Sequence, residues 1–250
     1  DEEMINRWVA SRTQGKVDRL VEGLDPNTIC VILNAVYFKG IWDRQFDRRD
    51  TGDAPFHLAD GTRVTAPLMS RTGHYRLLRG MDADAVSIPY RGKTLSMVIL
   101  LPHDADGLLK LESELTPERL PRWIEKLDSM QTQEIELFMP RLRLETGYDL
   151  VGPCRQLGMK DAFERRVADF GGMGWPVGAL WIDRVLHKAY LELNEEGSEA
   201  AAATSVTMRT FGEPEPVPVI RADHPFIFLI RVHRTGTILF FGRVADPTKG

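Results

Sequence analysis

A segment of small side chains, NEEGSEAAAATSVTM at residues 194–208, separates two strongly apolar parts of the chain. Read at the two-residue period of a strand, one face carries Ser198, Ala200, Ala202 and Thr204, which are all small and uncharged. The opposite face is more polar and is charged at both ends. Small side chains can enter between strands that are already in place, so the pattern permits this segment to join a sheet late.

The alternative for the same segment is an alanine-rich helix or a mobile loop, since alanine is the best helix former. No proline interrupts the segment before Pro214, so about a dozen residues can pair fully as a strand. At roughly 1 kcal/mol per net hydrogen bond, plus side-chain burial, insertion would contribute on the order of 10 kcal/mol. The pattern alone leaves both readings open and slightly favours the helix or loop.

The composition is that of an ordinary soluble protein and excludes several classes of partner. The chain has 250 residues, 43% of them hydrophobic and 27% charged, which allows a sizeable core. Its net charge of -4 argues against nucleic acid and against a polybasic membrane surface, and no apolar run is long enough for a membrane helix. Cys30 and Cys154 fit free thiols better than a disulfide or a reactive thiol.

The residue types that carry chemistry are present without the spacing that the chemistry needs. None of the serines lies in a GxSxG elbow, and the histidines form no HExxH or i, i+4 pair. The glycines of FGGMGWPVG lack the GxGxxG spacing, and HDADG lacks the rest of a calcium loop. We therefore expect no catalytic residues, no metal and no cofactor.

Hydrophobic periodicity predicts one mixed domain of helices and strands without a linker. Residues 28–38 form a nearly unbroken apolar run, which predicts a strand buried on both faces with Asn34 as its polar interior residue. The apolar set changes parity around Pro140, as a bulge or an edge position requires. Further helices are expected at 4–9, 17–24, 116–127 and 147–159, and further strands at 134–145 and 184–193. Three hairpins are also expected: residues 56–69 with a turn at Asp60-Gly61, residues 85–102 with a turn across Arg91-Gly92-Lys93, and residues 225–244 with the turn HRTG.

Three long motifs, in the same order along the chain, resemble those of the serpin family. NEEGSEAAAAT resembles the serpin hinge, LNAVYFKGIWDRQF resembles a strand and turn of sheet A, and DHPFIFLIRV with TGTILFFGRVADP resembles the C-terminal signature. The resemblance spans nearly the whole chain. It implies an α+β serpin fold, with a large mixed β-sheet, further sheets, surrounding helices and an exposed reactive-centre loop at residues 195–218.

The family fold begins upstream of this sequence, with helices and strands that complete sheet A. The resemblance implies that residues 1–250 are the C-terminal portion of a single serpin domain. We expect the N-terminal segment in another chain or in a preceding part of the protein, unless the sequence is truncated, and we do not expect the fragment to inhibit alone. The family slightly favours an extracellular protein, whereas the lack of an Asn-x-Ser/Thr site favours a bacterial or intracellular one.

The activity that the resemblance implies is inhibition of serine or cysteine proteases by a protein that is not itself an enzyme. The target protease attacks the loop and forms an acyl-enzyme, and the freed loop then inserts into sheet A before deacylation. The alternative is a non-inhibitory serpin that serves as a carrier, storage or chaperone protein, but such relatives tend to place charged or bulky residues at buried hinge positions. The implied hinge residues are Glu195, Glu196, Gly197, Ser198, Glu199, Ala200, Ala201, Ala202, Ala203 and Thr204.

The usual inhibitory spacing of the family places the reactive bond between Phe211 and Gly212. A large aromatic side chain before the bond implies a chymotrypsin-like target protease. The alternative register places the bond between Arg209 and Thr210, which implies a trypsin-like protease.

Further residues carry over from the resemblance as parts that control sheet opening. Asn34 and His187 resemble the shutter pair, and Trp42 resembles the breach tryptophan. Arg141 resembles the basic partner of Glu195, and this ion pair is expected to hold the loop out until cleavage. Each of these residues also has a purely structural explanation: a core histidine, a core tryptophan, or an exposed ion pair that contributes about 0–1 kcal/mol.

Overall fold

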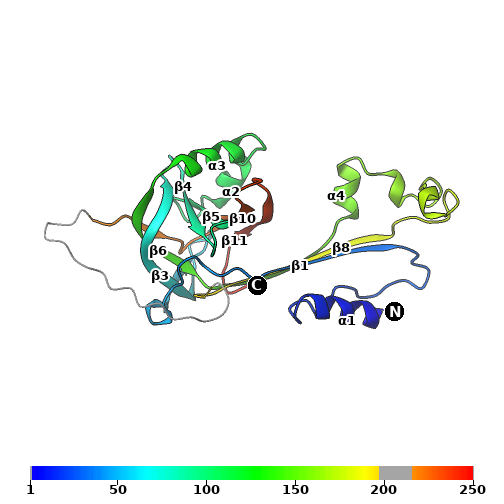
Figure 1. The fold of residues 1–250 in the computed structure, drawn as a ribbon, viewed down its shortest axis with the longest axis horizontal. Helices are drawn as coiled ribbons and strands as arrows, with labels where there is room; N and C mark the ends of the chain where they lie inside the picture. The colour runs from blue at the N-terminus through cyan, green and yellow to red at the C-terminus, as the bar shows by residue number, and fades with distance from the viewer. Residues whose placement is uncertain (1, 197–215, 250) are drawn as a thin grey trace. The chain divides into compact units, whose positions relative to one another are not determined.

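The computed structural model describes residues 2–196 and 216–249 and confirms the predicted α+β class (Figure 1). Two compact units are described separately: unit 1 is built from residues 1–38 and 143–191, and unit 2 from residues 39–142 and 192–249. The single domain inferred from the sequence stays a prediction.

The helices are α1 (Glu2–Arg12), α2 (Leu108–Glu114), α3 (Arg119–Ser129) and α4 (Val151–Gln156), with short 3-10 helices η1 (Arg48–Asp50), η2 (Asp161–Phe163) and η3 (Gly171–Met173). The strands are β1 (Val31–Phe38), β2 (Gly52–His57), β3 (Arg63–Leu78), β4 (Ala83–Pro89), β5 (Leu95–Pro102), β6 (Thr132–Pro140), β7 (Leu142–Asp149), β8 (Arg184–Leu193), β9 (Val219–Arg221), β10 (Phe226–Val232) and β11 (Ile238–Val244).

Unit 1 contains a three-stranded sheet in the order β1-β8-β7. Strands β1 and β8 run parallel, side by side, in an unbroken register from Val31 opposite Arg184 to Phe38 opposite Leu191 (Figure 1). Helix α1 begins with two glutamates and ends with an arginine, which suits the helix dipole. It packs through Val9 on one side of this unit, so the predicted first helix is confirmed.

The second helix expected at residues 17–24 is wrong, because the structure has irregular backbone there. The Asn6 side chain binds this segment directly: its Oδ1 accepts from the backbone N–H groups of Leu20 and Val21, both at 2.9 Å, and its Nδ2 donates to the Val21 carbonyl at 2.8 Å. Val17 and Val21 are still fully buried. Hydrogen bonds to a helix side chain therefore replace the i to i-4 bonds that the apolar spacing suggested.

The prediction that residues 28–38 are buried on both faces is also wrong. No residue of β1 is fully buried, and Ile32 is 42% exposed. Strand β1 also lies at the edge of the sheet, paired with β8 alone among the described strands. The apolar run suits a strand with both faces covered, but the described residues do not cover both faces of β1.

Unit 2 contains an eight-stranded sheet in the order β11-β10-β5-β4-β3-β6-β9, with β2 paired to β3. The predicted hairpins are confirmed, with β2 and β3 joined around Gly61 and β4 and β5 joined around Gly92, both at positive φ. Helices α2 and α3 cover one face of the sheet, as Figure 1 shows. The core between them includes Val98, Leu100, Leu111, Leu127, Ile227 and Leu229.

The helix expected from Thr116 onward is confirmed but begins later, at Arg119. The Thr116 side chain and carbonyl both accept from the Arg119 backbone N–H, so Thr116 still caps the first turn. The parity change near Pro140 marks the point where β6 of the large sheet ends and β7 of the small sheet begins. Among the described helices, none is long and apolar enough to cross a membrane.

Candidate functional site

A buried carboxylate lies just beyond the end of β8. Strand β8 ends at Leu193, and in the turn that follows, Glu195 is only 2% exposed. One oxygen of the carboxylate, Oε1, accepts from both Nε and Nη2 of Arg141, with the Nε contact at 2.7 Å, and from Thr51 Oγ1 at 2.5 Å. Arg141 is the residue between β6 and β7, so its guanidinium is positioned beside the carboxylate by the junction of these two strands.

The ionisation of Glu195 reflects two opposed effects. Burial raises the pKa of the carboxyl group, while the hydrogen bonds from Arg141 and Thr51 lower it. The hydrogen bonds outweigh burial, and the pKa lies below the ordinary value. Glu195 is therefore charged and buried at neutral pH, with three hydrogen bonds to its Oε1.

The backbone around Glu195 is held as firmly as its side chain. The Phe46 N–H donates to the Glu195 carbonyl at 2.9 Å, and the Trp42 indole Nε1 donates to the Asn194 carbonyl at 2.9 Å. The Trp42 backbone N–H and the Gln45 amide both donate to the Glu196 carbonyl, at 3.4 and 3.3 Å. We call Glu195, Arg141, Thr51, Phe46 and Trp42 the Glu195 cluster.

Trp42 is fixed by aromatic packing as well as by its hydrogen bond. Its ring is 1% exposed and stacks on Tyr90 with centroids 4.5 Å apart and planes 9° apart. Phe46 meets it edge-on at 6.1 Å. The indole therefore combines core packing with a specific donor, and the structural and functional interpretations of Trp42 both fit its geometry.

The chain is anchored again where the described residues resume. Strand β9 pairs in parallel with β6, and the Glu136 N–H donates to the Pro218 carbonyl at 2.9 Å. The two anchors thus involve β6 and the residue that follows it, Arg141. The predicted reactive bonds, Phe211–Gly212 and Arg209–Thr210, and the hinge residues from Gly197 to Thr204 lie outside the described residues.

The structure brings Asn34 and His187 together in unit 1. They are opposite one another in the β1–β8 register, and His187 Nδ1 lies 3.2 Å from Asn34 Oδ1. The other side of the imidazole stacks on Tyr148 of β7, with centroids 6.4 Å apart. Asn34 is exposed and His187 is half-buried, so this pair is much less enclosed than the Glu195 cluster.

Sequence reasoning missed the supporting members of the Glu195 cluster. Thr51 lies 144 positions from Glu195 along the chain, and Phe46 and Tyr90 look like ordinary core residues in sequence. Arg48, which pairs with Glu196 at 2.6 Å, was missed as well. Only the LNAVYFKGIWDRQF motif, which includes Trp42 and Phe46, carried a signal for this part of the site.

Comparison with known proteins gives one consistent result. A family model described as "Serpin (serine protease inhibitor)" matches residues 1–247. Human Serpin B3 is 40% identical over 97% of this chain and 63% of its own length, and horse leukocyte elastase inhibitor is 40% identical over 97% of this chain and 65% of its own length. This chain thus spans less than two thirds of these relatives.

Solved structures agree on the fold. Uncleaved ovalbumin superposes with a TM-score of 0.84 at 30% identity, covering 98% of this chain and 62% of ovalbumin. Human thyroxine-binding globulin gives a TM-score of 0.84 at 31% identity, covering 98% of this chain and 64% of the globulin. The family model and the horse relative are described as inhibitors, and the globulin is described as a thyroxine-binding protein. They lend no support to the extracellular placement, and the compartment stays a prediction.

Proposed function

Because this chain belongs to the serpin family, we propose that it inhibits a serine protease as a suicide substrate. The observation that carries the proposal is the Glu195 cluster, a buried and charged hinge base directly before residues 197–215. Arg141 and Thr51 hold the Glu195 carboxylate, and the Phe46 N–H holds its backbone carbonyl. Together these bonds fix the point at which the chain leaves β8. A reactive loop needs such a fixed origin so that it is presented outward until it is cut.

The other end of the proposed loop is fixed by β9 and by the bond from Glu136 to Pro218. Cleavage between the two ends frees the N-terminal part to move while its origin at Glu195 is retained. Strands β1 and β8 are parallel, and a chain that reverses after β8 runs antiparallel to both. Insertion between them replaces one ladder of hydrogen bonds by two, which supports the estimate of about 10 kcal/mol gained.

The chemistry belongs to the target protease. Its serine Oγ attacks the carbonyl carbon of Phe211, the bond to the nitrogen of Gly212 breaks, and the protease histidine gives the leaving amine its proton. The product is an ester between the protease serine and Phe211. Ser198, Ala200 and Ala202 are small enough to follow one another into the sheet before water hydrolyses that ester.

Specificity for a chymotrypsin-like protease rests on Phe211, and the register with Arg209 remains its rival. The test incubates the protein at its natural length with chymotrypsin and with trypsin, followed by a denaturing gel and intact mass. We expect a covalent complex with chymotrypsin whose mass places the ester at Phe211. Phe211→Ala is expected to abolish that complex, while the matched change Arg209→Ala leaves it unchanged.

A second variant separates inhibition from plain cleavage. Ala202→Arg places a charge at a hinge position that the proposal buries, so we expect cleavage without a stable complex. After cleavage the melting temperature of the unmodified protein should rise by about 20 °C or more, given about 10 kcal/mol and 2–4 °C per kcal/mol. Cleavage with an unchanged melting temperature contradicts loop insertion.

The alternative is a non-inhibitory serpin that binds a ligand. The similarity to thyroxine-binding globulin favours this candidate, since that relative is named for a small molecule it binds. It predicts that both proteases cut the loop as an ordinary substrate, with no ester retained on the gel. The chymotrypsin incubation therefore decides between the two functions.

A further inference from the structure

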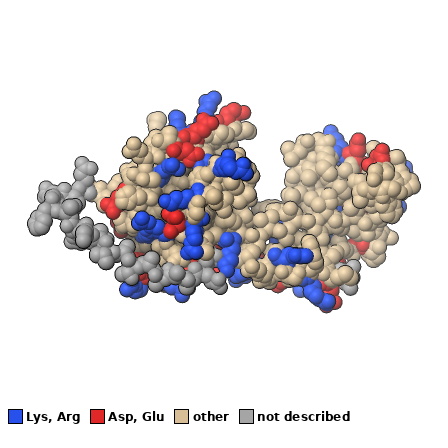
Figure 2. Space-filling view, in the orientation of Figure 1, with Lys and Arg blue, Asp and Glu red and all other residues tan. Residues whose placement is uncertain are grey.

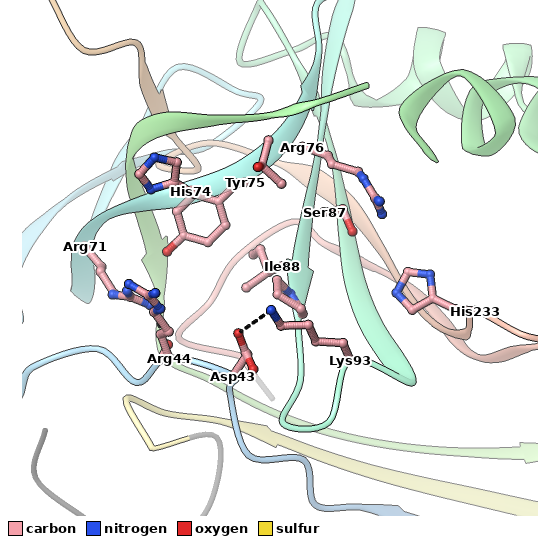
Figure 3. Close-up of a pocket in the computed structure, with 12 residues that line it drawn as sticks. Asp43, Arg44, Arg71, His74, Tyr75, Arg76, Ser87, Ile88, Lys93 and His233 are labelled. Atoms are coloured by element: carbon pink, nitrogen blue, oxygen red, sulfur yellow. Dashed lines mark hydrogen bonds and ion pairs between the residues drawn. The ribbon is translucent and has the colours of Figure 1, made fainter. Parts of the chain in front are cut away.

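A cavity of about 550 Å³ opens within unit 2, beside β3 and β4 (Figure 3). Its wall is unusually basic for a protein with a net charge of -4. On the face drawn in Figure 2, the surface of this unit mixes acidic with basic side chains. The cavity has Asp43 as its acidic residue, while its basic residues are Arg44, Arg71, His74, Arg76, Lys93 and His233.

The one carboxylate does not neutralise these cations. Asp43 lies 3.6 Å from Lys93 Nζ, and this is the contact drawn in Figure 3. Arg71 Nη1 instead donates to the backbone carbonyl of Arg44 at 2.8 Å, which brings two like charges to the same wall. Among the described residues, neither of these arginines forms a salt bridge. Their positive charge therefore remains available to a ligand.

Two donor groups in the cavity wall are buried and lack a hydrogen-bond acceptor in the part of the chain that the structure describes. Burial and the nearby charge of Arg44 lower the pKa of Arg71, and they outweigh the opposing effects of Tyr75 and Asp43. Tyr75 is only 4% exposed, and its hydroxyl has no hydrogen-bond partner among the described residues. Figure 3 shows that hydroxyl turned toward Arg71. Arg76 Nε is buried and unpartnered in the same way, and such groups cost free energy until an acceptor reaches them.

We propose that this cavity binds a small organic anion, in which a carboxylate, sulfate or phosphate group is attached to an apolar body. The acid group accepts from Arg71, Arg44 and the Tyr75 hydroxyl, and the apolar body packs on Ile88 and Pro89. The volume lies within the roughly 300–1,000 Å³ of ordinary small-molecule sites. The proposal rests on this cavity alone, so it and the inhibitory function can fail independently.

The test compares two probes that share one ring system. The anion 8-anilinonaphthalene-1-sulfonate and the neutral N-phenyl-1-naphthylamine are each titrated into the protein, with fluorescence and calorimetry as readouts. We expect one sulfonate per chain and at least tenfold weaker binding of the neutral probe. Inorganic sulfate is expected to compete only at far higher concentration, because it lacks the apolar body.

Variants locate the bound sulfonate. Arg71→Met should weaken its binding about tenfold, whereas the matched change Arg63→Met, on the same strand but outside the cavity, leaves it unchanged. Tyr75→Phe keeps the buried ring and removes only the unpartnered hydroxyl, so the melting temperature should hold or rise while affinity falls about threefold to tenfold.

Three outcomes overturn the proposal. The first is equal affinity for the charged and neutral probes, which would make the site merely apolar. The second is an Arg71→Met affinity within twofold of Arg63→Met, and the third is an unchanged affinity in Tyr75→Phe. If Arg71→Met fails to fold, the Tyr75→Phe variant decides alone.

Discussion

Two regions connected by the same strand are held in very different ways. In the middle of β8, His187 meets Asn34 through a single contact of 3.2 Å, and Asn34 is exposed. Just beyond the end of β8, Glu195 is buried and both its side chain and its carbonyl are bonded. The difference teaches that side-chain bonds hold the turn after the strand far more firmly than they hold the middle of the strand, where β1 and β8 are joined mainly by their backbone ladder. The inhibitory function proposed above requires such a division, because the sheet has to open while the origin of the loop is retained.

The largest effect on the unfolding free energy is expected from breaking the Arg141–Glu195 ion pair, in the firmly held region after β8. Arg141→Met leaves the Glu195 carboxylate buried with Thr51 as its remaining side-chain donor. Breaking a buried ion pair costs about 3–5 kcal/mol, and we expect about 3 because the Arg141 side chain is itself 42% exposed. Urea unfolding monitored by fluorescence measures the change in unfolding free energy.

Substitution of the other member of the ion pair, Glu195, provides the control. Glu195→Gln leaves a half-exposed guanidinium that water can reach, so it should cost less, about 1–2 kcal/mol. The double variant is expected to be more stable than Arg141→Met alone, since no buried charge remains. Equal costs for the two single variants would contradict the assignment of Glu195 as the buried partner.

The second effect is the pH dependence of the Glu195 cluster. The folded-state pKa of Glu195 is lowered from 4.5, so the carboxylate contributes stability above about that pH and loses it as the pH falls through the folded-state value. The difference in unfolding free energy between the unmodified protein and Glu195→Gln should therefore be largest at pH 7. We expect it to shrink as the pH falls below about 4.5 and through the lowered folded-state pKa. A difference that stays constant throughout an acid titration excludes Glu195 as the titrating group.

The sequence predicted the hairpins and α3 because apolar runs and turn residues there agree with the final packing. It could not predict irregular backbone at residues 17–24, because Asn6 overrides the local pattern through bonds made 14 and 15 positions away. The pairing of Arg141 with Glu195 entered only through the family resemblance, and the Thr51 hydroxyl left no signal at all. Contacts between distant segments decide these features, and no local periodicity records them.

The third prediction tests the contact between Asn34 and His187, in the middle of β8. Asn34→Ala removes one exposed hydrogen bond and should cost less than about 1 kcal/mol. Asn6→Ala is the matched asparagine in the same unit, and it should cost more, about 2 kcal/mol, because its side chain makes three bonds to the backbone of another segment. Urea unfolding of both variants checks the ranking. If Asn34→Ala costs as much as Asn6→Ala, the middle of β8 is not loosely held.

The smallest effect on the unfolding free energy is expected from Arg48→Gln, which tests whether an exposed ion pair next to Glu195 stabilises the fold as a buried one does. Arg48 pairs with Glu196 at 2.6 Å, one residue beyond Glu195, but its side chain is 71% exposed. Solvent screens such a pair, so Arg48→Gln should cost no more than about 0.5 kcal/mol, and less still at 1 M salt. Unfolding free energies of Arg48→Gln and Arg141→Met, measured together at low and high salt, give the comparison. A cost for Arg48→Gln close to that of Arg141→Met would show that exposed and buried ion pairs hold the turn at residues 194–196 equally. The expected gap of at least about 2.5 kcal/mol instead assigns the fixed end of β8 to the buried carboxylate of Glu195.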